Sequence, residues 1–204
     1  MKLFVTGIGT DVGKTVVSAV LTEALQADYW KPVQCGNLTN SDTKLVKSLV
    51  SNKHSKFHAE SYRFKLPASP HAAAAKEKTT IDLKKIKPPT TKNHLIIEGA
   101  GGLLVPLNDK DLVIDLIKKL QIPAIVVSRN YLGSINHTLL TLSALRENNI
   151  EVAGIIFNGP PTPTSEDYIL NYFDIKMLGR ILNEKKITKD IVSKYAKQFK
   201  NLAI

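Results

Sequence analysis

Short, continuous apolar runs alternate along the chain with longer segments in which apolar residues recur at helical spacing. The runs predict buried β-strands over residues 3–6, 29–32, 94–98, 123–128 and 152–157. The longer segments predict helices over residues 15–25, 111–120, 136–147, 165–172 and 190–199, and after a cap at residues 40–42. Because continuous apolar strands alternate with helices, the pattern predicts a mainly parallel sheet with helices on both faces.

Residues 51–92 are the least regular part, and they predict loops with a short alanine-rich helix over residues 71–76. The chain has 204 residues, of which 43% are hydrophobic and 23% charged, and this composition excludes a disordered or fibrous protein. We expect one α/β domain over residues 1–204, because this length suits a single core. The single cysteine, Cys35, excludes an internal disulfide and a zinc site built from several thiolates.

The formal net charge is +10, and four of the 28 basic residues are arginine. Lysine-rich solvated faces explain this charge most simply, and a positive field that gathers anionic substrates is the alternative. The shortage of arginine weakens a nucleic-acid interpretation. No apolar run is long enough for a membrane span or a signal peptide, so we expect a cytoplasmic protein without membrane or nucleic-acid partners.

The most informative motif is Gly-Ile-Gly-Thr-Asp-Val-Gly-Lys-Thr at residues 7–15, between a predicted strand and a predicted helix. This is the context of a phosphate-binding P-loop, in which backbone N–H groups and the helix N-terminus surround an anion. Lys14 could reach the outer phosphates, and the Thr15 hydroxyl could bind Mg²⁺. The loop has one residue more than the common pattern.

Three further side chains fit a nucleotide and metal site. Glu98 ends a buried strand, at the edge of the sheet where ligands bind in open α/β folds, although a solvated or helix-capping carboxylate is the simpler interpretation. Asp42 could be a magnesium ligand or only a helix cap. Lys31 follows the second strand and could stabilise charge during phosphoryl transfer, or be one surface lysine among many.

Together these motifs resemble the dethiobiotin synthetase family, whose members are ATP-dependent cyclo-ligases. The resemblance runs from residue 3 to about 160. It is carried by the P-loop, by Lys31-Pro32-Val33-Gln34, Asn40-Ser41-Asp42, Ser61-Tyr62-Arg63-Phe64, Pro70-His71, Glu98-Gly99-Ala100-Gly101-Gly102, Pro106-Leu107, residues 132–137 and residues 154–158. The long P-loop is itself a family trait. The resemblance implies a P-loop NTPase-like fold and a homodimer whose active site is completed across the interface.

The family reaction joins 7,8-diaminopelargonic acid and CO₂ at the expense of ATP, through a carbamate and a carbamoyl-phosphate mixed anhydride. The resemblance implies that Lys31 and Lys14 are catalytic. It implies Mg²⁺ ligands at Thr15, Asp42 and Glu98. It implies contacts with ATP or its metal at Asp11, Val12, Gly13, Lys14, Thr15, Val16, Asp42, Glu98, Gly99, Ala100, Gly101 and Asn158. It implies substrate contacts at Thr10, Lys31, Cys35, Leu132, Gly133 and Asn136.

Several positions depart from the family pattern. Cys35 stands where serine or threonine is usual, and residues 180–183 lack the usual proline. Because Asn158 is followed by Gly159, we expect modest discrimination between ATP and other triphosphates. The main rival is a partitioning-type P-loop ATPase, but residues 7–10 contain no extra lysine of that group. A cobyrinate-type amide ligase would need a glutamine-hydrolysing domain for which the chain has no room.

Overall fold

The computed structural model describes residues 1–200 and 202 and contains a seven-stranded sheet. Its strands are β1 (Lys2–Gly7), β2 (Asp28–Trp30), β4 (Phe57–His58), β6 (Leu95–Glu98), β7 (Ala124–Arg129), β8 (Val152–Asn158) and β9 (Met177–Ile181). They lie in the order β4-β2-β6-β1-β7-β8-β9, and every neighbouring pair is parallel. Two short strands, β3 (Val33–Cys35) and β5 (Tyr62–Phe64), form a separate parallel pair.

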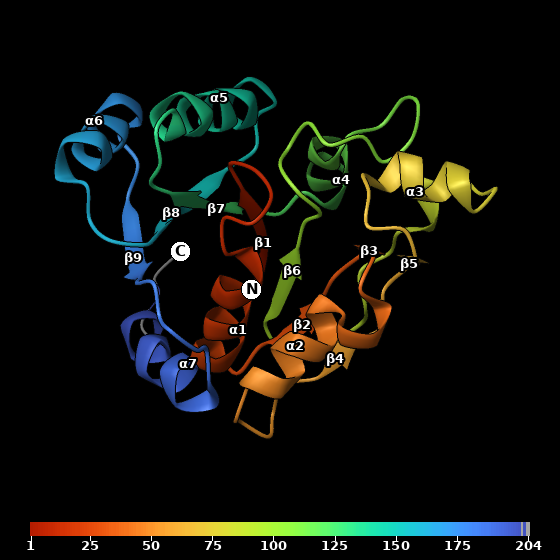
Figure 1. The fold of residues 1–204 in the computed structure, drawn as a ribbon, viewed down its shortest axis with the longest axis horizontal. Coiled ribbons are helices and arrows are strands. Elements are labelled where there is room, and N and C mark those ends of the chain that lie inside the picture. The colour runs from red at the N-terminus through yellow and green to blue at the C-terminus, as the bar shows by residue number, and fades with distance from the viewer. Residues whose placement is uncertain (201, 203–204) are drawn as a thin grey trace.

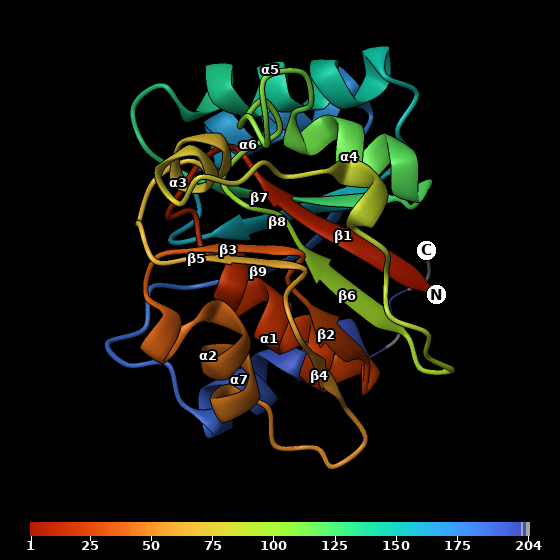
Figure 2. The same cartoon turned by 90° about the vertical axis from the view of Figure 1, so that its right-hand side faces the viewer.

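Helices cover both faces of the sheet, as the sequence predicts. They are α1 (Lys14–Leu25), α2 (Asp42–Leu49), α3 (Pro70–Lys76), α4 (Val113–Leu120), α5 (Ser134–Glu147), α6 (Pro163–Phe173) and α7 (Lys189–Ala196). Short 3-10 turns occupy η1 (Leu38–Asn40), η2 (Leu83–Lys85) and η3 (Lys197–Phe199). Helices α4, α5 and α6 lie over one face, and α1, α2 and α7 over the other (Figure 2).

The central strand β1 carries the P-loop into the middle of the molecule (Figure 1). Leu3, Phe4 and Val5 are fully buried, as expected for a strand that pairs on both sides and is covered on both faces. Because all the main strands are parallel, their carboxyl ends meet at one rim. That rim receives the end of β1 and the ends of β2 and β6, so it gathers the three motifs singled out in the sequence.

The structure differs from the predicted elements in three places, and the first is β3, which follows the predicted end of the second strand at Pro32. Strand β9 lies in a stretch, Met-Leu-Gly-Arg-Ile, whose glycine and arginine hide the strand signal. The region over residues 51–92 contains β4 and β5, which have only two and three residues and so show no period in the sequence. Other element boundaries shift by up to two or three residues. Helix α6, for example, begins at Pro163, because proline suits the first helical turn.

Among the described residues, no helix is both long and apolar enough to cross a lipid bilayer.

Candidate active site

The P-loop has the strained backbone that an anion cradle requires. Gly13 has φ +97° and Asp11 has φ +56°, both in the left-handed region. A side chain at Gly7 would come within 2.5 Å of Val12 Cγ2, so the close turn also needs glycine there. Helix α1 starts at the next residue after Gly13 and points its N-terminus into the loop.

Lys14 lies folded back into this loop. Its Nζ donates to the carbonyl oxygen of Gly9 at 2.7 Å, and the residue is only 7% exposed. Burial lowers the pKa of the Lys14 ammonium to about 8, against the opposing attraction of Glu98. The lysine is therefore held inside the loop, with one of its N–H groups bound to a backbone carbonyl.

Beside the P-loop, Thr15, Asp42 and Glu98 lie together with the ammonium of Lys31. The Thr15 hydroxyl lies 2.9 Å from Glu98 Oε1 and 3.3 Å from Asp42 Oδ1. Lys31 Nζ lies 3.0 Å from Glu98 Oε1 and 2.6 Å from Asp42 Oδ2. The helix cap of α2 is Ser41, which accepts from the backbone of Lys44, so Asp42 remains available to the site.

Lys31 is a charged group in a buried place. Its side chain is 7% exposed and that of Glu98 is 1% exposed. Burial alone would lower the pKa of the Lys31 ammonium, but the ion pairs with Glu98 and Asp42 outweigh this and raise it. Lys31 therefore keeps its proton, and its positive charge is available to an anion that displaces one of the acids.

These oxygens form a donor set that suits Mg²⁺. They are two carboxylates and one hydroxyl, all hard ligands, and a cationic ammonium already lies between the carboxylates. Among the described residues no cluster of three or more His, Cys, Asp or Glu forms a metal site.

Two residues that sequence reasoning missed hold the acids in place. The Tyr29 hydroxyl donates to Glu98 Oε2 at 2.8 Å, and Tyr29 is fully buried on β2. Gln34 Oε1 accepts from the backbone N–H of Asp42 at 3.1 Å. Tyr29 has the sequence signal of a core aromatic, and only the pairing of β2 with β6 brings it to Glu98.

Several of the remaining predicted residues lie at or beside the P-loop. Asn158, at the end of β8, donates through Nδ2 to the Val12 carbonyl at 2.9 Å, so it supports the P-loop. Gly101 has φ +67°, and a side chain there would lie 3.7 Å from Thr10 Oγ1, which places the turn after β6 against the P-loop. Ala100 and Gly99 belong to the same turn, and Val16 lies in the first turn of α1.

Cys35 lies half-buried at the end of β3, and burial raises the pKa of its thiol to about 11. It therefore offers a neutral S–H group, which is a weak hydrogen-bond partner. Leu132, Gly133 and Asn136 are all exposed, between β7 and the first turn of α5. Among the described residues, no hydrogen bond joins these three to the P-loop.

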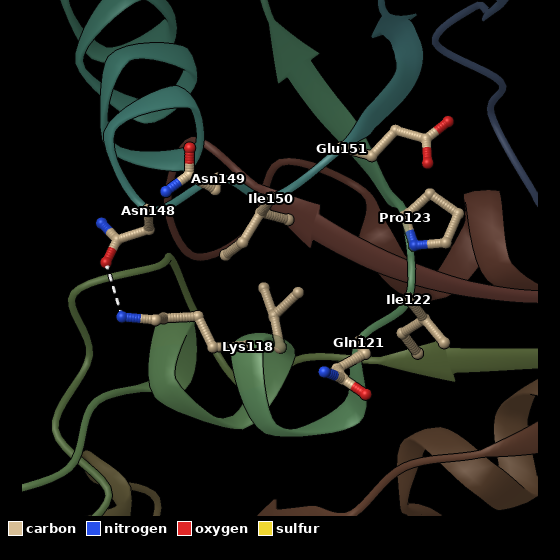
Figure 3. Close-up of a pocket in the computed structure, with 9 residues that line it drawn as sticks. Lys118, Gln121, Ile122, Pro123, Asn148, Asn149, Ile150 and Glu151 are labelled. Carbon is tan, nitrogen blue, oxygen red and sulfur yellow. Dashed lines mark hydrogen bonds between the residues drawn. The ribbon is translucent and has the colours of Figure 1, made fainter.

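A cavity of about 360 Å³ lies away from this site (Figure 3). It is formed by the ends of α4 and α5 and by the segments that precede β7 and β8, at the opposite end of the parallel strands. Its charged side chains are Lys118, which donates to Asn148, and Glu151. Its lining includes no P-loop residue and neither Asp42 nor Glu98, so this cavity is separate from the candidate active site.

A parallel sheet with a glycine-rich loop, its lysine and a hydroxyl–carboxylate set at the carboxyl rim defines a P-loop nucleoside-triphosphate-binding protein. Residues 1–190 match a family model described as "AAA domain". The chain is 52% identical over 197 residues to the ATP-dependent dethiobiotin synthetase BioD of Christiangramia forsetii, covering 97% of this chain and 95% of the relative. The chain belongs to the ATP-dependent dethiobiotin synthetase family.

A second synthetase supports the same family, and a solved structure supports the fold. The synthetase of the same name from Cytophaga hutchinsonii is 54% identical over 196 residues, covering 96% of this chain and 95% of the relative. Among solved structures, the cell division ATPase MinD of Pyrococcus furiosus matches with a TM-score of 0.55 at 14% identity, covering 99% of each chain. At that identity the likeness shows the fold alone, so it gives no support to a partitioning-type function.

Proposed function

We propose that the protein closes the ureido ring of dethiobiotin from 7,8-diaminopelargonic acid, CO₂ and ATP, releasing ADP and phosphate. The observation that carries this proposal is the meeting of Thr15, Lys31, Asp42 and Glu98 beside Lys14. Membership of the dethiobiotin synthetase family supports the choice of reaction. ATP and CO₂ are both available in the cytoplasm, where we place the activity.

The nucleotide's phosphates would bind in the P-loop. The backbone N–H groups over residues 9–15, the N-terminus of α1 and the Lys14 ammonium would offset their negative charge. Thr15, Asp42 and Glu98 would hold Mg²⁺. When bound, the ion would neutralise charge that develops on the phosphates during transfer. Phosphoryl transfer needs mainly positioning and fixed charge, and this rim supplies both.

The reaction would proceed in three balanced steps. First, one substrate amine attacks CO₂, which forms an N–C bond and releases a proton to give a carbamate. Second, a carbamate oxygen attacks the γ-phosphorus, and the bond to ADP breaks. Third, the other amine attacks the carbonyl carbon of the mixed anhydride, loses its proton and expels phosphate. Binding all three reactants together removes much of the entropic barrier.

Lys31 is the chain's own group for the first two steps. Its ammonium stays protonated because Glu98 and Asp42 raise its pKa, so it can bind an anionic carbamate oxygen. An ammonium fixed in a buried rim needs little reorganisation as charge moves from the carbamate to the phosphoryl group. We assign Lys31 and Lys14 as the catalytic residues. We assign ATP contacts to Asp11, Val12, Gly13, Val16, Gly99, Ala100, Gly101 and Asn158.

We also propose a homodimer with a shared substrate pocket. Leu132 is 103% exposed, and Leu140 and Tyr131 are 60% and 43% exposed. A single copy thus leaves an apolar surface open beside Gly133 and Asn136, the residues expected to bind the substrate's carboxylate, while Thr10 and Cys35 would contact its other end. Sedimentation at activity-assay concentrations should give a dimer, and a fully active strict monomer would contradict the shared pocket.

The function is tested by incubating the protein with 7,8-diaminopelargonic acid, bicarbonate and Mg-ATP and detecting dethiobiotin by mass. The product should form one for one with ADP. Lys14→Ala is the matched negative variant, because it removes the phosphate contact and leaves the buried acids in place. ATP hydrolysis without ring closure, equal in both proteins, would contradict the proposal.

A further inference from the structure

The loop that follows β8 is fastened to β9 and α6 by a buried ion pair. Strands β8 and β9 and helix α6 lie together at one side of the molecule (Figure 1). Arg180 of β9 donates through Nη1 to Glu166 Oε1 at 3.0 Å, and its Nη2 pairs with Glu166 Oε2. Glu166 of α6 is only 5% exposed, so this two-pronged pair is largely shielded from water.

The same two side chains also hold the backbone of the loop. Arg180 Nη1 donates to the carbonyl oxygen of Gly159 at 3.1 Å. Glu166 Oε1 accepts from the backbone N–H of Thr162 at 3.0 Å and from the side chain of Asn130. Asn130 in turn donates to the carbonyl oxygen of Pro160 at 3.3 Å. The backbone of the loop over residues 158–162 is therefore held by hydrogen bonds at Gly159, Pro160 and Thr162.

The start of this loop contacts the P-loop. Asn158 Nδ2 donates to the Val12 carbonyl at 2.9 Å. A side chain at Gly13 would come within 2.1 Å of Asn158 Nδ2, so the two segments are packed as closely as glycine allows. A continuous series of contacts thus runs from Arg180 through Gly159 and Asn158 to the phosphate-binding loop.

The strand order indicates which end of a nucleotide meets this loop. The acids and Lys31 come from β6, from α2 and from the residue after β2, all on one side of the central strand β1. The terminal phosphate must face them for transfer to occur. Strands β8 and β9 lie on the other side of β1, so the nucleoside end extends over the loop that follows β8.

We propose that Arg180 and Glu166 are positioning residues for the nucleoside end of the bound nucleotide. The pair acts through the loop at residues 158–162 and does not touch the reacting atoms. Breaking it should weaken nucleotide binding and leave the chemistry at Lys31 intact. This inference rests on the proposed function for the identity of the nucleotide, and its test uses binding measured without the diamine substrate.

The test compares Arg180→Lys, Arg180→Gln and Glu166→Gln with the original protein. The Kd for Mg-ATP is measured by titration calorimetry, and KM and kcat are measured in the ring-closure assay. In Arg180→Gln and Glu166→Gln, both the Kd and the KM for Mg-ATP should rise about tenfold, which corresponds to the loss of one charge-assisted hydrogen bond. The kcat and the KM for the diamine should stay within about twofold, because binding energy that the ground state and the transition state lose equally leaves kcat unchanged.

Arg146→Ala is the matched control. Arg146 is an exposed arginine of α5 that lies over the Phe173 ring of α6 at 4.1 Å, in the same helical layer but without a hydrogen bond to the loop. It should leave the Kd for Mg-ATP unchanged. Arg180→Lys keeps the charge and loses the planar fork, so it should recover only part of the affinity.

Two results would overturn the inference. One is an unchanged Kd and KM for Mg-ATP in a folded Arg180→Gln or Glu166→Gln protein. The other is a fall in kcat at constant KM that follows a lower melting temperature, which would mark a structural role only. A failure of the proposed ring-closure function would give a different result, because the original protein would then bind Mg-ATP but form no dethiobiotin.

Discussion

Two buried carboxylates lie on the neighbouring strands β2 and β6, one at the amino-end rim of the sheet and the other at the carboxyl-end rim. They differ in their hydrogen-bonding partners. Asp28, at the start of β2, is fully buried and accepts from the Lys56 backbone and the Asn93 side chain at 3.0 and 2.8 Å, with His58 Nε2 2.9 Å away. Glu98, at the end of β6, is paired with Tyr29, Thr15 and Lys31.

The difference lies in which partners can be exchanged. Asp28 is bound by a backbone N–H and by side chains whose own positions it fixes, so removing any of them costs stability. Glu98 keeps one fixed donor, Tyr29, and shares Oε1 with a lysine and a hydroxyl, which a metal ion or an anion can draw away. A buried acid with exchangeable partners is suited to ligand binding, and one with fixed partners to folding.

The largest effect should follow Lys31→Ala. Loss of the ammonium should lower kcat of ring closure roughly 10²- to 10³-fold, as when one fixed donor to a transition state is removed. Initial rates at saturating Mg-ATP measure this. Lys118→Ala, at the cavity on the opposite end of the sheet, is the control and should be fully active. Activity that survives in Lys31→Ala would remove Lys31 from the site.

A smaller effect should follow Tyr29→Phe, which removes the fixed donor to Glu98. The change should raise the Mg²⁺ concentration for half-maximal rate about tenfold, as for lost hydrogen bonds behind metal ligands. It should also lower the free energy of unfolding by about 1–3 kcal/mol, because Glu98 Oε2 is left buried and unpaired. An unchanged Mg²⁺ requirement alongside lost stability would make Tyr29 a core residue only.

Asp28→Asn should leave the rate unchanged and affect only stability. Burial raises the pKa of the Asp28 carboxyl, but the bonds from Asn93, the Lys56 backbone and His58 outweigh this and lower it. A group whose folded pKa is lowered stabilises the protein above its unfolded pKa of about 4 and loses that contribution as pH falls through the folded pKa.

Urea unfolding between pH 3 and pH 7, a window set by that pKa of about 4, measures this change. The original protein should lose stability toward acid, and the Asp28→Asn protein should be less stable at neutral pH by about 1–3 kcal/mol with a flatter acid dependence. Equal slopes in the two proteins would contradict the assignment of Asp28 as the titrating group. A reduced rate per folded molecule would remove the contrast with Glu98.

The sequence predicts the parallel sheet and its helical layers correctly, because the buried strands are continuous apolar runs and the helices have long periodic faces. It also selects Lys31, Asp42 and Glu98, which the structure brings together, because parallel strands end at a common rim. Their roles stay predictions. The alternative that Asp42 is only a helix cap is wrong, since Ser41 accepts the capping bond.

Sequence reasoning could not find the residues whose significance depends on strand register. Tyr29 faces Glu98 only because Trp30 pairs with Ile97 in the adjacent strand. Arg180 lies beside Gly159 because β9 pairs with β8, and the strand itself gives no apolar run. Such contacts join residues far apart in the chain, and no local spacing encodes them.

The bond from Lys14 to the Gly9 carbonyl bears on how tightly a nucleotide is held. A phosphate that takes this lysine replaces an existing partner, so the measured affinity is the difference between two interactions. The intrinsic lysine–phosphate attraction is then stronger than a dissociation constant suggests. Release of that phosphate would let the Gly9 carbonyl accept from Lys14 again, and the loop would return to the shape it has here.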